Sequence, residues 1–215
     1  MIKFRNPMSL LIVVLSLILF NNGFAQEKKF ATLGFKGIHL GMTQAEVNEV
    51  VNSGKGWSFK SGPNIIGNYL NLNTDSPIGC RGQGETEECY KIKTVTLQFF
   101  EGRVIQIFLR SPQYAATDID YYVKGWARFG LQVLKKKFGD PSTVNLSIDR
   151  FNIFSVRSSG DLEVLYYWYK KDEAILLSIG SDDFEYYAAI NYVNGRAAVK
   201  INQEKQKIKS EMGSR

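Results

Sequence analysis

The chain has 215 residues, of which 44% are hydrophobic and 13% aromatic, and its formal net charge is +6. This length suits one medium domain or two small domains packed together, with enough chain to bury a core. The charge does not predict nucleic-acid binding, because residues 26–195 carry 19 basic and 19 acidic side chains. The excess lies in residues 196–215, with six basic and two acidic side chains, which we expect to form a solvated basic tail rather than a functional arm.

Residues 1–25 have the pattern of a secretory signal peptide. Lys3 and Arg5 precede the apolar run Leu10–Phe20, and small residues lead to a cleavage site after Ala25. The alternative is a retained membrane anchor, but the run is shorter than the ~20 residues of a spanning helix. We therefore predict export to the periplasm or the exterior, with no membrane span after cleavage and no nearby cysteine for lipid attachment.

Cys80 and Cys89, the only two cysteines, lie in a polar, glycine-containing stretch. In an exported chain such a pair predicts one disulfide that closes a loop. We expect no metal, because thiolate sites recruit three or four ligands and the single histidine, His39, is distant in sequence.

The first predicted element is a short helix from Gln44. Thr43 and Glu46 have capping-box spacing, Val47, Val50 and Val51 share one face, and Gly54 is placed to end the helix.

A polar stretch with a possible strand near 68–72 follows, and then two alternating runs around Gly102 predict a β-hairpin with one buried side. The residues expected on that side are Val95, Leu97, Phe99, Ile105, Ile107 and Leu109.

Helix signals return at Thr117 and continue for about twenty residues until Gly139 and Pro141. The stripe expected to face the core consists of Tyr122, Val123, Trp126, Phe129, Val133, Leu134 and Phe138. A second β region should follow, with a strand at 151–156, a hairpin turning at 170–173 and a last strand at 184–193.

The order of helix, strands and hairpin thus occurs twice, at about 35–112 and 113–195. The predicted domains are the signal peptide, a first α/β repeat with the disulfide loop at 26–112, a second α/β repeat at 113–195 and the tail. The predicted fold class is α+β, two pseudo-repeats with helices packed on one face of an antiparallel sheet, through Val47, Val51, Trp126 and Val133.

The string GIHLGMTQAEV at Gly37–Val47, with KKKFGDP at Lys135–Pro141, resembles exported repeat modules. The similar families are the BamE (SmpA/OmlA) outer-membrane lipoproteins and the β-lactamase-inhibitory-protein-like group. The resemblance implies helices on an antiparallel sheet and a role in binding other proteins.

No constellation of side chains predicts catalysis or a cofactor, and His39 alone does not make a catalytic site. Aromatic residues are dense on two predicted strands, and alternation should turn some of them away from the helices. The candidate binding residues are Tyr166, Tyr167, Trp168, Tyr169, Tyr186 and Tyr187. We therefore predict a non-enzymatic protein-binding module, an envelope adaptor or inhibitor of an unknown envelope or secreted partner. The alternatives are ordinary burial of these aromatics, or a periplasmic protein that binds a small ligand or glycan.

Overall fold

The computed structural model describes residues 33–54, 56–61, 68–82, 88–156, 162–197 and 199. The predicted signal peptide and all but the first residues of the predicted tail lie outside this part of the chain. Within it, no helix combines the length and the apolar character needed to cross a membrane.

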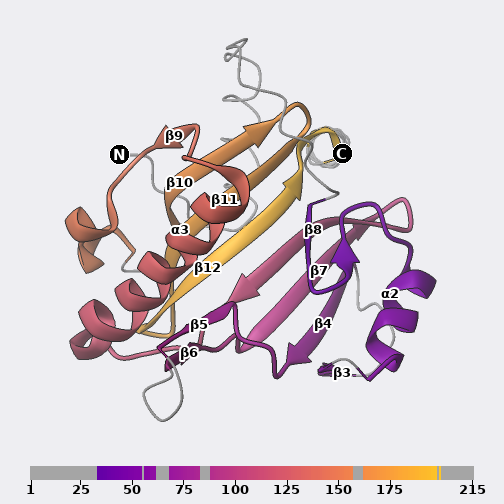
Figure 1. Cartoon of the computed structure of the whole chain (residues 1–215), viewed down its shortest axis with the longest axis horizontal. Helices are drawn as coiled ribbons and strands as arrows, with labels where there is room; N and C mark the ends of the chain where they lie inside the picture. The colour runs from indigo at the N-terminus through magenta and orange to yellow at the C-terminus, as the bar shows by residue number, and fades with distance from the viewer. Residues whose placement is uncertain are drawn as a thin grey trace, which may run out of the picture.

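The centre of the molecule is one eight-stranded antiparallel sheet with the order β3-β4-β7-β8-β12-β11-β10-β9 (Figure 1). Chain positions 57–110 supply the first four of these strands, and positions 143–194 supply the other four. Their bounds are β3 Trp57–Phe59, β4 Tyr69–Thr74, β7 Thr94–Phe100, β8 Arg103–Arg110, β9 Thr143–Val144, β10 Leu162–Lys170, β11 Glu173–Asp182 and β12 Glu185–Asn194. The two groups meet where β8 pairs with β12.

The predicted fold class is wrong, because the protein is mostly β. Besides the large sheet there are two short ribbons, β1 Gly34–Phe35 with β2 Ile38–His39, and β5 Gly79–Arg81 with β6 Glu88–Tyr90. The helical part consists of one stretch of 23 residues and the nine-residue helix α2, Gln44–Asn52. An arrangement of helices covering one sheet face therefore does not describe the molecule. The pattern-based reading missed the short strands β3, β5, β6 and β9, whose residues do not alternate over a long enough run.

Helix α2 begins as its sequence predicts. The Thr43 amide donates to the Glu46 carboxylate at 2.6 Å, and the Glu46 amide donates to the Thr43 hydroxyl at 3.3 Å. The Thr43 hydroxyl also donates to the Glu46 carboxylate at 2.9 Å, and the two hydrogen bonds that this carboxylate accepts hold the pKa of Glu46 below its usual value. Val47 and Val51 are buried, and half-buried Val50 packs against the main core, so both the predicted cap and the predicted face are confirmed.

The predicted central hairpin is also confirmed, with one difference in side-chain direction. Its turn places Glu101 and Gly102 at φ values of 49° and 73°, the left-handed pair typical of a tight hairpin turn. A register shift after Gln98 sets Val104, rather than Ile105, opposite Phe99. This bulge removes Ile105 from the main core cluster, because one extra residue reverses the alternation.

The long helical stretch comprises the 3₁₀ turn η2 Ala116–Asp118, the π turn η3 Ile119–Val123 and the α-helix α3 Lys124–Phe138. Helix α3 contacts β11 and β12. At this contact, a Cβ atom added to Gly130 would lie 3.5 Å from the side chains of Ile190 and Leu177.

The predicted strand at 151–156 is wrong: Ile153–Ser155 form a 3₁₀ turn, η5, capped by the Asn152 side chain. A second such turn, η4, spans Ile148–Arg150.

Two apolar clusters form the core. The main one joins side chains of both helices and the sheet, including Val47, Trp126, Leu97 and Ile190. The second cluster, among the described residues, is built from strands alone: Leu162, Val164, Tyr167, Ala174, Leu176, Tyr187, Ala189 and Val193. Strands β10 to β12 therefore bury side chains on both faces.

Candidate functional site

The aromatic residues predicted for binding do not form an open face. Tyr166, Trp168 and Tyr186 belong to the main core, and Tyr167 and Tyr187 belong to the second cluster. All five are 8% exposed or less. The expectation that alternation would turn some of them to solvent therefore fails, because this part of the sheet is buried on both faces. The sixth candidate residue, half-buried Tyr169, packs against the second cluster.

Some of these aromatics have structural hydrogen bonds. The Trp168 indole donates to the Gly139 carbonyl at 2.9 Å, and the Ile148 amide donates to the Tyr166 hydroxyl at 3.3 Å. These bonds tie β10 to the end of α3 and to η4. They identify Tyr166 and Trp168 as parts of the packed interior.

Burial of Tyr167 predicts a loss of stability in alkaline solution. The pKa of the Tyr167 hydroxyl is raised to about 12, mainly by burial and to a smaller extent by the negative charge of the Glu163 carboxylate. The unfolded chain loses the Tyr167 hydroxyl proton at the ordinary pKa of 10, whereas the folded protein keeps it up to about pH 12. The folded protein therefore has its full stability below pH 10 and loses part of it as the pH rises toward 12. Urea unfolding at successive pH values should show this decline, and Tyr167→Phe should make it shallower. An identical decline in both proteins would contradict the assignment.

A different set of tyrosines, which we call the tyrosine cluster, lies at the surface: Tyr114, Tyr121 and Tyr122. The rings of Tyr114 and Tyr122 stack with centroids 4.7 Å apart, and the Tyr121 ring meets Tyr122 edge-on at 4.8 Å. Tyr121 is 69% exposed and Tyr122 is 46% exposed. Both arrangements are favoured by the charge distribution of aromatic rings, so the cluster presents ordered aromatic surface to solvent.

The backbone fixes the cluster at two places. Tyr114 and Tyr186 exchange amide-to-carbonyl bonds of 2.9 and 2.8 Å, which join the segment after β8 to the start of β12. In the π turn η3, Ile119 and Val123 are buried while the two intervening tyrosines are exposed. A π turn holds more residues than an α turn, so Tyr122 leaves the inward stripe that a regular helix would give it.

The disulfide hairpin β5–β6 lies beside this surface (Figure 1). Cys80 and Cys89 form the predicted disulfide, with their Cα atoms 4.1 Å apart. Tyr90 of β6 stacks on Phe129 of α3 with ring centroids 4.4 Å apart. Gly79 permits this approach, since a Cβ there would lie 2.7 Å from the Phe129 ring. The disulfide is consistent with an oxidising extracellular compartment.

Tyr90 is the aromatic residue through which the disulfide hairpin contacts α3. Burial is the main cause that raises the pKa of Tyr90, and the Glu88 carboxylate and the Tyr121 hydroxyl also contribute. The Glu88 carboxylate in turn accepts from Arg81, 2.8 Å away. Tyr90 is half-buried and packs on Phe129 and the main core, so it anchors the disulfide hairpin to α3.

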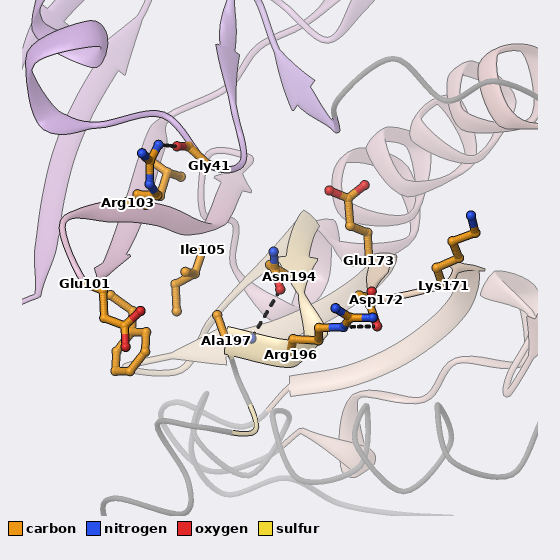
Figure 2. A pocket seen from close by; sticks show the side chains of 12 residues that line it. Gly41, Glu101, Arg103, Ile105, Lys171, Asp172, Glu173, Asn194, Arg196 and Ala197 are labelled. Carbon is orange, nitrogen blue, oxygen red and sulfur yellow. Dashed lines mark hydrogen bonds and ion pairs between the residues drawn. The ribbon is translucent and has the colours of Figure 1, made fainter.

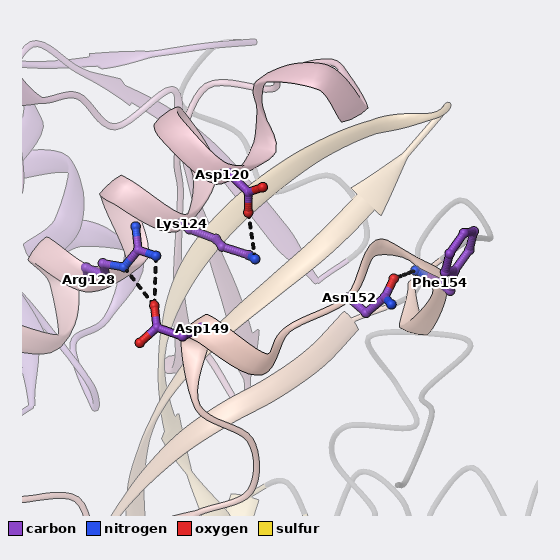
Figure 3. Close-up of polar contacts among 6 residues, drawn as sticks. All are labelled: Asp120, Lys124, Arg128, Asp149, Asn152 and Phe154. Carbon is purple, nitrogen blue, oxygen red and sulfur yellow. Dashed lines mark hydrogen bonds and ion pairs between the residues drawn. The ribbon is translucent and has the colours of Figure 1, made fainter.

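Ion pairs balance the charges around the helix start (Figure 3). Figure 3 shows Asp120 directed to Lys124 and Asp149 directed to Arg128, with nitrogen–oxygen distances of 2.6 and 2.8 Å. The hydrogen bond from Lys124, and then its charge, lower the pKa of Asp120. Because these charges are paired, contact area rather than net charge distinguishes the surface.

A groove of about 660 Å³ lies between the β7–β8 turn, the β10–β11 turn and the end of β12 (Figure 2). Its charged side chains hold these turns together. Arg196 pairs with Asp172 at 2.7 Å, and Arg103 donates to the Gly41 carbonyl at 2.8 Å. The groove contains both signs of charge and gives no selective chemistry for one ligand class.

Metal binding has no geometric support in the described part of the chain, where no group of three or more His, Cys, Asp or Glu side chains could hold an ion. His39 lies half-buried in β2. Comparison of the chain with protein-family models, curated proteins and solved structures found no match.

The sequence contained one signal for the tyrosine cluster that pattern reasoning missed. Tyr121 and Tyr122 are adjacent, and two neighbouring helical positions cannot both face the core. Tyr122 would face the core only in a regular α-helix. The chain forms a π turn here instead, and Tyr122 lies at the surface.

Proposed function

We propose that this protein is an exported, non-enzymatic protein-binding module, an envelope adaptor or inhibitor, whose contact surface is the tyrosine cluster. The observation that carries the proposal is the Tyr122 ring, stacked on half-buried Tyr114 and met edge-on by Tyr121, with Tyr121 and Tyr122 exposed to solvent. The aromatic binding surface predicted from the sequence thus moves from the sheet to the start of the long helix.

Tyrosine suits this role for two physical reasons. It supplies a large contact area and a hydroxyl for hydrogen bonding, and it is enriched among the residues that dominate binding energies. Rings that already stack in the free protein lose little conformational entropy on binding. The π turn and the Tyr114–Tyr186 bridge provide this preorganisation.

Two further features agree with the proposal. The segments Gly37–Val47 and Lys135–Pro141 resemble those of exported families that bind proteins, and the Cys80–Cys89 disulfide suits a periplasmic or secreted protein. The paired charges around η3 favour a partner that docks through apolar and aromatic contacts.

Photo-crosslinking tests the proposal directly. A photoreactive phenylalanine analogue replaces Tyr121 in one variant and Tyr69 in another, and both are expressed with the full leader in the source cells. Tyr69 is a matched control because it is 43% exposed but lies on β4, in the other half of the sheet. We expect a discrete protein adduct from position 121 and none from position 69.

Two results would count against the proposal. Equal adducts from both positions would indicate non-specific contact. The absence of an adduct from position 121 would show that no protein partner contacts the tyrosine cluster. Competition by a panel of simple glycans tests the alternative function. If simple sugars abolish binding of the partner, and Tyr121→Ala abolishes it too, the result would favour glycan stacking on the same rings.

A further inference from the structure

A smaller pocket, of about 250 Å³, lies over the seam between β8 and β12. Its lining is apolar: Leu109 and Ile190 come from the sheet, and Val133 and Leu134 come from α3. The remaining lining residues are Gly34, Phe35, Lys36, Ile78, Lys137 and Tyr192. The pocket is thus enclosed by the sheet, the long helix and the β1–β2 ribbon.

Two lysines give this pocket a charge. Lys36 comes from the turn of the β1–β2 ribbon, Lys137 comes from the last turn of α3, and both are exposed. Neither makes an ion pair with another described residue. Two ammonium groups from different elements beside an apolar lining are complementary to an anion with an apolar body.

A buried hydroxyl adds a polar group to the lining. Tyr192 is 4% exposed and lines the pocket, so its ring and hydroxyl belong to the pocket wall. Burial raises the pKa of Tyr192, so the phenol stays protonated and able to donate. A carboxylate bound in the pocket can accept a hydrogen bond from this hydroxyl.

We propose that this pocket binds a small amphipathic carboxylate, with an aromatic or branched alkyl body on Leu109 and Ile190 and its charge near Lys36 and Lys137. A cavity of ~150 Å³ holds benzene, so the volume here suits a body of about ten non-hydrogen atoms. This site is separate from the tyrosine cluster, and the proposal does not depend on the proposed function.

Binding of hydrocinnamate to the mature protein tests this proposal, with hydrocinnamyl alcohol as the neutral ligand of matched shape. Calorimetry should give a dissociation constant below about 1 mM for the acid, a value within the usual efficiency of ligands of this size. The double variant Lys36→Gln/Lys137→Gln should weaken the acid by about tenfold and leave the alcohol unchanged, since each exposed ion pair contributes modestly. Lys136→Gln, on the same helix turn but outside the lining, is the control.

Val133→Phe places a larger side chain in the pocket and should abolish binding of both ligands without a change in the unfolding transition. Tyr192→Phe should weaken hydrocinnamate about fivefold if the hydroxyl donates to it. The proposal fails if hydrocinnamate does not bind, if the double variant binds it as the wild type does, or if binding survives in folded Val133→Phe, because each result would remove the pocket or its charge from recognition.

Discussion

Replacing Trp126 by alanine should lower the free energy of unfolding by about 3 to 5 kcal/mol, as expected for truncation of a buried large aromatic residue. Trp126 is 3% exposed in the main core, and its indole donates to the Lys91 carbonyl at 2.8 Å. That bond joins α3 to the segment that follows the disulfide hairpin. Alanine would leave both a cavity and an unpaired carbonyl, and urea denaturation measures the sum of the two effects.

Gln132→Ala provides the matched control for this measurement. Gln132 lies on the exposed side of the same helix, so its replacement should change stability by less than about 0.5 kcal/mol. A loss below about 1 kcal/mol for Trp126→Ala would show that the side chain is not buried as described and would refute the assigned face of α3.

Removal of the disulfide by Cys80→Ser with Cys89→Ser should cost about 2.5 kcal/mol, the chain-entropy value for a loop of this length. Cys80 and Cys89 are directly opposite each other in the β5–β6 pair. The wild type measured in a reducing agent should lose the same amount as the double variant. Since the hairpin also docks through Tyr90 on Phe129, the fold should persist after reduction.

Mass spectrometry of the unreduced peptide containing both cysteines provides the chemical check, because the disulfide form lacks two hydrogens. Free thiols in protein recovered from the envelope would contradict the pairing. A double variant as stable as the oxidised wild type would show that packing alone, rather than the crosslink, holds the hairpin.

The elements predictable from sequence were those specified by local chemistry. Thr43 and Glu46 cap α2 through their own backbone amides, and the Glu101–Gly102 turn fixes the β7–β8 hairpin. The cysteine spacing likewise determined the disulfide. Each of these features depends on residues close together in the chain, so spacing and side-chain type were sufficient.

The features that were missed depend on distant partners. Strand β3 has three residues and exists because β4 pairs with it, and β9 has two residues and pairs with β10. A two-residue pairing leaves no periodic pattern. Missing these short strands led to an underestimate of the share of strand, whereas both predicted helices are present.

Burial of the sheet aromatics was missed for a related reason. The runs LEVLYYWYK in β10 and EAILLSIGSD in β11 are nearly continuous in apolar residues, which is the pattern of strands covered on both faces. Alternation assumes one solvated face. Tyr121 and Tyr122 instead lie in a π turn that precedes α3, and single-sequence periodicity does not reveal such a turn.

The central claim is that the tyrosine cluster binds a protein partner, and the affinity of the partner captured by crosslinking at position 121 tests it most directly. Tyr121→Ala with Tyr122→Ala should weaken that partner by about 2 kcal/mol or more, roughly thirtyfold in the dissociation constant, while the unfolding transition stays unchanged. Tyr69→Ala should leave the affinity at the wild-type value. Unchanged affinity in the folded double variant, or an equal loss in Tyr69→Ala, would contradict the claim.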